Sequence, residues 1–223
     1  MSSNHAMILG EYIVNQNNYT SSFTFASIPT DYDVIEIHVA GSLTRDQDSG
    51  ATGQTQYLAC SIQDTHDPSS TGYTADVSRM HMSWQTNWRD QNKYSWAWRG
   101  SVANPIYFGY VPVNMQNNGS DTASKAFAVT FQLMGPNSGA PKQVFWRGTC
   151  SDSNAGSLSR KTQGCFGLDI QGNTTVRDWG KGPWRSLRMG LSNYGTYNAA
   201  TSPTFKAGTV FQMIGYKGSG EGW

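Results

Sequence analysis

Few residues in this sequence could carry acid–base, nucleophilic or metal chemistry. Its 223 residues include four histidines, three glutamates and twelve aspartates. No histidine stands in a metal-ligand spacing, and no GxSxG, P-loop or GxGxxG motif occurs. Glu36 and His38 alternate on the outer side of an expected strand, which favours a solvated or cross-strand pair over a catalytic one. Glycoside hydrolysis needs two facing carboxylates, and no pair stands out. We therefore expect no enzymatic activity, no cofactor and no bound metal.

The cysteines Cys60, Cys150 and Cys165 have no metal-ligand spacing, so we expect buried thiols. A Cys150–Cys165 bridge would close a short loop, but synthesis in a reducing compartment disfavours it. The first residues show neither the basic region nor the apolar run of a signal peptide, and no run of apolar residues is long enough to span a membrane. We expect synthesis in the cytoplasm of a host cell.

Aromatic residues gather in two segments. The first contains Trp84, Trp88, Tyr94, Trp96 and Trp98, and the second contains Trp179, Trp184 and Arg185. Aromatic rings present flat faces on which the C–H groups of sugars can stack, so these residues are candidates for a ligand surface. Trp and Arg are also enriched in protein–protein contacts, and the alternation of Trp96 and Trp98 fits a core or a subunit interface. Both interpretations stay open.

Short strands must position these residues, because apolar and polar residues alternate with a period of two along most of the chain. The clearest runs lie at 33–42 and 127–133, and clusters of Gly, Asn, Ser and Asp separate them from the others. No amphipathic helix is apparent. About eleven short strands at roughly even spacing predict an all-β fold, an antiparallel β-sandwich of jelly-roll type.

We expect a single domain over residues 1–223, since no change in composition marks a boundary. Residues 1–6 differ from the rest and are interpreted as a tag remnant or a docking arm. Residues 217–223 are rich in glycine and are expected to form a flexible tail.

The charge balance excludes some classes of partner. Sixteen Lys and Arg residues oppose fifteen Asp and Glu residues, giving a net charge of +1. This argues against nucleic-acid binding and against a polybasic membrane anchor. Only 14% of residues are charged, which is low against a typical value of about 25%. An uncharged polar surface over an aromatic core is typical of secreted or virion β proteins.

Two segments carry a family resemblance. One is YTSSFTFASIPTDY at 19–32, leading into the strand at 33–39, and the other is FKAGTVFQMIGY at 205–216. Together they resemble jelly-roll virion surface proteins of tailed bacteriophages, of the tail-fibre or head-decoration type found in cyanophages. The resemblance covers about a fifth of the chain and consists of packing motifs. It implies the fold and a place in the virion, and it carries over no functional residue.

These observations predict a non-enzymatic structural protein on the exterior of a phage virion, as a fibre-type or head-decoration module. The expected partners are two further copies in a homotrimer and other virion proteins, with a host-surface glycan as a further candidate. Neither nucleic-acid binding nor membrane insertion is expected. One alternative is a lectin-like carbohydrate-binding module, which needs an exposed aromatic row. The other is a glycan depolymerase, which needs two carboxylates about 5–10 Å apart in a cleft.

Overall fold

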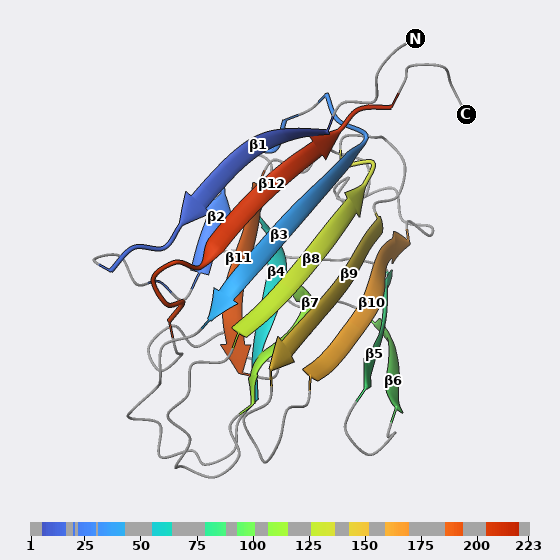
Figure 1. Cartoon of the computed structure of the whole chain (residues 1–223). Coiled ribbons are helices and arrows are strands. Elements are labelled where there is room, and N and C mark those ends of the chain that lie inside the picture. Colours follow the sequence, from blue (N-terminus) through green and yellow to red (C-terminus); the bar gives the residue numbers. More distant parts are fainter. Residues whose placement is uncertain are drawn as a thin grey trace.

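The computed structural model of the chain describes residues 6–16, 20, 22–29, 31–42, 55–63, 79–87, 93–100, 107–115, 126–136, 143–151, 159–169, 186–193 and 204–218. The regular structure in these ranges consists of strands, and each strand pairing among them is antiparallel (Figure 1). The prediction of an all-β, antiparallel chain is confirmed. Within the described residues, no helix is long and apolar enough to cross a membrane.

The strands form two sheets. In spatial order, the larger sheet contains β1 (Ala6–Ile13), β12 (Val210–Tyr216), β3 (Val34–Ser42), β8 (Ala126–Met134), β9 (Gln143–Ser151), β10 (Ser159–Asp169), β5 (Arg79–Asn87) and β6 (Lys93–Gly100). The smaller sheet contains β2 (Ser22–Phe25), β11 (Ser186–Asn193), β4 (Thr55–Gln63) and β7 (Tyr107–Met115). The first and last strands are therefore neighbours, and Ala6 is the register partner of Tyr216.

Alternation along each strand decides which face of the larger sheet is buried. In β3, Ile35, Ile37 and Val39 are fully buried, whereas Glu36 and His38 point to the outer face. Successive side chains of a strand point to opposite sides, so burial of one set directs the other set to solvent. The same alternation continues in β8, where Phe131 is fully buried and Gln132 is half-buried.

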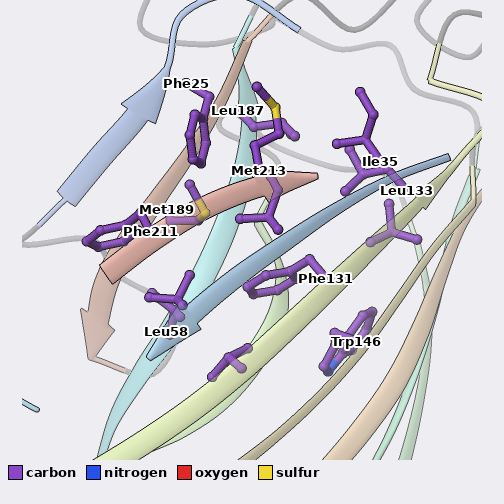
Figure 2. Packing of buried hydrophobic residues seen from close by; sticks show 14 of the residues in the cluster. Phe25, Ile35, Leu58, Phe131, Leu133, Trp146, Leu187, Met189, Phe211 and Met213 are labelled. Atoms are coloured by element: carbon purple, nitrogen blue, oxygen red, sulfur yellow. The ribbon is translucent and has the colours of Figure 1, made fainter. Parts of the chain in front are cut away.

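One hydrophobic core fills the space between the two sheets. Figure 2 shows Phe131 and Trp146 of the larger sheet on the same cluster as Leu58 and Met189 of the smaller one. Burial of large apolar side chains is the main favourable term in folding, at roughly 25 cal/mol per Å² removed from water. The buried side chains of the larger sheet thus pack against buried side chains of the smaller sheet.

Gly215 in β12 lies on this inner face at a point of close packing. A β-carbon there would lie 2.5 Å from Cδ1 of Tyr32 and 2.7 Å from Cδ1 of Leu9. Carbon atoms in contact normally stay about 3.5–4.0 Å apart, so only a residue without a side chain fits. The Tyr32 ring can then lie over the end of the sheet, where its hydroxyl reaches Sδ of Met7 at 3.3 Å.

Both ends of the chain enter the described structure. Ala6 is the first residue of β1, and residues 1–5 lie outside the described ranges, so the interpretation of residues 1–6 stays a prediction. The first two residues of the expected tail make contacts. Lys217 Nζ lies 3.8 Å from Oδ2 of Asp31, and the amide of Gly218 donates to Oδ2 of Asp33 at 2.6 Å. Residues 219–223 lie outside the described ranges.

The cysteine prediction holds for one residue and is wrong for another. Cys150 is buried, whereas Cys165 is exposed, and neither takes part in a disulfide. Cys165 is the register partner of Phe145, which points to the outer face, so its own position also faces outward. The side chain of Cys60 lies outside the described residues.

Candidate functional site

The outer face of the larger sheet carries a polar cluster that joins three neighbouring strands. We call it the Glu36 cluster, and it consists of Glu36 and His38 of β3, Thr130 and Gln132 of β8, and Tyr216 of β12. Register places these strands together, because β3 pairs with β12 on one side and with β8 on the other. The expected Glu36–His38 pair is therefore present as part of a larger network.

The Glu36 carboxylate is the centre of this cluster. Its Oε2 accepts a hydrogen bond from the Tyr216 hydroxyl at 2.9 Å and lies 3.1 Å from Nε2 of His38. Its Oε1 accepts a hydrogen bond from the Gln132 amide at 3.2 Å. An ionised carboxylate has about four acceptor positions, so these three contacts leave about one for another donor.

His38 links the carboxylate to a hydroxyl. In the tautomer with its proton on Nε2, His38 donates to Glu36, and its Nδ1 accepts from the Thr130 hydroxyl at 3.4 Å. The His38 side chain is 38% exposed and that of Glu36 is 18% exposed. The cluster is thus ordered by its own contacts while it remains open to solvent.

The Tyr216 hydroxyl is perturbed by this environment. Partial burial raises its pKa above the ordinary value of 10.0, and the hydrogen bond to Glu36 and the charge of Glu36 raise it further. Burial disfavours the ionised phenol, and ionisation would also place a second negative charge beside the Glu36 carboxylate. Tyr216 therefore acts as a neutral donor in this cluster.

A second carboxylate, Glu11 of β1, lies on the same face but has a different partner. Its Oε2 accepts a hydrogen bond from the Gln212 amide at 3.0 Å, and Gln212 lies between Glu11 and His38 in register. Glu11 lies two strand spacings from His38, and Glu36 lies two residues from His38 along β3. The Cα atoms of Glu11 and Glu36 are therefore roughly 12 Å apart. The arrangement presents hydrogen-bonding groups in a plane. Among the described residues, no three His, Cys, Asp or Glu side chains are grouped to hold a metal ion.

Phe145 and Arg147 of β9 lie beside the Glu36 cluster on the same outer face. Phe145 is the register partner of Gln132, and Arg147 is the register partner of Thr130. The Phe145 side chain is 44% exposed, although large aromatic residues usually contribute most when they are buried. An exposed ring and an exposed guanidinium thus border a set of ordered polar groups.

Four of the predicted Trp-rich candidates lie on the paired strands β5 and β6. Trp84 and Trp96 are register partners, Trp98 faces Met82, and Tyr94 faces Thr86. Trp84 is the register partner of Gly164 in β10, and Gly164 is the register partner of Trp146 in β9. Trp146 is only 2% exposed. The assignment of the four candidates to a core, an interface or a ligand stays a prediction.

The remaining candidates, Trp88, Trp179, Trp184 and Arg185, lie outside the described residues. Trp146 was not singled out from the sequence, and it has an unusual feature. Its Nε1 atom is buried and has no hydrogen-bond partner in the described part of the chain. A buried donor without a partner costs about 1–3 kcal/mol, which offsets part of the stabilisation from burying the Trp146 ring.

Sequence reasoning identified Glu36 and His38 but missed three further members of the cluster. Thr130, Gln132 and Tyr216 come from strands 92 to 180 positions away along the chain, and only the strand pairing brings them together. Phe145 was also missed. Its signal was the alternation of 143–150, in which Val144 and Trp146 are buried and the residue between them must point outward.

Comparison with models of known protein families gave no match. Comparison with curated proteins gave no significant match either.

Proposed function

We propose that the chain is a non-enzymatic structural protein of a tailed-phage virion exterior, of jelly-roll type, which acts by associating with further copies and with other virion proteins. The observation that carries the associating role is the apolar edge of β1. The resemblance of residues 19–39 and 205–216 to virion surface proteins supports the location.

The strand pairing supports the jelly-roll part of this proposal. A jelly roll is one long antiparallel ribbon of eight strands, so its first strand pairs with its last, its second with its seventh, and so on inward. The pairs β1–β12, β2–β11, β3–β8 and β4–β7 follow that order. The remaining strands, β5–β6 and β9–β10, are hairpins inserted between members of this ribbon and added to one side of the larger sheet.

The edge strand β1 supports association. It is the last strand on one side of the larger sheet, and no described strand pairs with its outer edge. Met7, Ile8 and Ile13 of this strand are 58%, 59% and 51% exposed. Long apolar edges promote uncontrolled pairing, so native proteins protect or cover them. Glu11 is the only Asp, Glu, Lys or Arg within β1, so the edge has little protection by charge.

The solution mass of the purified chain tests this proposal. We expect light scattering to give a stable trimer, three times the 24.5 kDa of one chain. The double variant Ile8→Lys with Ile13→Lys should dissociate it, because two charges on an apolar contact are costly to bury. The control is Phe145→Lys, which places one lysine on an exposed apolar position of β9 and should leave the mass unchanged.

A monomeric wild-type chain, or a trimer that the β1 variant leaves intact, would contradict this assignment of the edge. A monomer would favour the second candidate function, a lectin-like module. One observation favours that candidate independently: Phe145 is exposed beside a hydrogen-bonding cluster on an open sheet face.

A further inference from the structure

We propose that the outer face of β3, β8 and β9 binds a glycan, with one sugar ring stacked on Phe145 and its hydroxyls held by Gln132, Arg147 and Glu36. This inference rests on the proposed exterior role, which it deepens by naming a ligand class and a place.

The first argument is the alignment of an aromatic ring with polar groups. Glu36, Gln132 and Phe145 are successive register partners on three neighbouring strands. Strands lie about 4.8 Å apart, so the row spans roughly 10 Å between its outer Cα atoms. That length suits one or two sugar units lying across the strands. The ring supplies a flat face for C–H groups, and the row supplies hydrogen bonds along one side of it.

The second argument is the hydrogen-bonding capacity that remains. Gln132 uses one N–H toward Glu36, and its carbonyl oxygen has no partner among the described atoms. Glu36 retains about one acceptor position after its three contacts. Arg147 is exposed and adds fixed donors two residues from Phe145 on the same side of β9. Hydroxyl groups both donate and accept, so a sugar satisfies this mixture of donors and acceptors.

The third argument is that the polar groups are already ordered. Tyr216 and His38 hold Glu36 from one side, and Gln132 holds it from the other. A ligand that binds pre-ordered groups loses less conformational entropy to side-chain ordering.

The test is binding of the purified full-length chain to an array of immobilised bacterial oligosaccharides, followed by titration of the best ligand. We expect Phe145→Leu to weaken binding by about tenfold, because leucine keeps the apolar volume but lacks the aromatic face. Phe145→Trp should retain binding. Gln132→Ala should weaken it as well, since it removes both a ligand contact and a contact to Glu36.

Two matched controls separate this site from others. Ile13→Leu alters an exposed apolar residue on the same face at the distant edge strand and should not change affinity. Trp96→Phe tests the Trp-rich segment. If binding falls with Trp96→Phe and not with Phe145→Leu, the glycan site lies elsewhere and the inference is wrong.

The absence of binding to every glycan on the array would also overturn the inference. That outcome would leave the proposed association untouched, because the solution mass is measured without any glycan. Conversely, a monomer that binds glycans through Phe145 would contradict the association and support the glycan site.

Discussion

The Tyr216 hydroxyl donates a 2.9 Å hydrogen bond to Oε2 of Glu36, and these residues lie 180 positions apart in the chain. The contact joins β12, the last strand along the chain, to its neighbour β3 in the larger sheet. It also makes the sheet sensitive to the charge state of one phenol.

We expect Tyr216→Phe to lower the stability of the chain near neutral pH and to reduce its loss of stability in alkali. Folding raises the pKa of Tyr216 above 10.0, so the folded state binds more protons than the unfolded state once the pH exceeds that value. The stabilisation is therefore complete below pH 10.0 and is lost as the pH rises through the folded-state pKa. At neutral pH the variant should lose about 1 kcal/mol, the contribution of one hydrogen bond.

Urea unfolding at about pH 7 and about pH 11 measures both effects. The wild-type chain should lose more stability between the two values than the variant. Other tyrosines and lysines titrate in this range in both proteins, so the difference between the two slopes is the informative quantity. Equal slopes would show that the Tyr216–Glu36 contact does not couple to folding.

We expect Gly215→Ala to destabilise the fold by about 1–3 kcal/mol, which is typical of adding a methyl group to a filled space. The new β-carbon would lie 2.5 Å from Cδ1 of Tyr32. Gly10→Ala is the matched control on the neighbouring strand, because its nearest atom would be Cε1 of Phe25 at an ordinary 3.5 Å. Thermal unfolding should place Gly10→Ala within about 1 kcal/mol of the wild-type chain. A similar loss in both variants would mean that glycine flexibility, and not packing, governs the two positions.

We expect Phe131→Ala and Phe145→Ala to differ sharply although the two residues lie on adjacent strands. Phe131 is 0% exposed in the core, and its truncation should cost about 3–5 kcal/mol. Phe145 is 44% exposed on the opposite face, and its truncation should cost less than about 1 kcal/mol. Chemical denaturation measures both values. A large loss for Phe145→Ala would mean that this ring supports the fold and would remove the basis for assigning it to a ligand.

The strands with strong apolar alternation could be predicted from the sequence because burial of one face dictates that pattern. β3 and β8 are examples, with Ile35, Ile37 and Phe131 inward. The first half of β10 could not be predicted. Ser159 to Lys161 lack apolar alternation, and their extended conformation depends on pairing with β9.

The candidate site was predictable only within single strands. Glu36 and His38 are two residues apart, so their shared face follows from the strand period. Tyr216 and Gln132 join them through pairings that no local pattern encodes. The Trp-rich segments were conspicuous in composition, yet composition does not say which face of a sheet a residue occupies. The pairing of Trp84 with Trp96, and of Trp84 with Gly164, likewise follows from strand register and from no local pattern.

The pairing of β1 with β12 has a consequence for how the protein is made. A ribosome adds about 5–20 residues per second, so β1 waits roughly 10–40 s before residues 210–216 emerge to pair with it. During that time Met7, Ile8 and Ile13 have no native neighbour on either side of their strand. The growing chain therefore carries an unpaired apolar strand until synthesis is nearly complete, and slower translation near the end would lengthen that exposure.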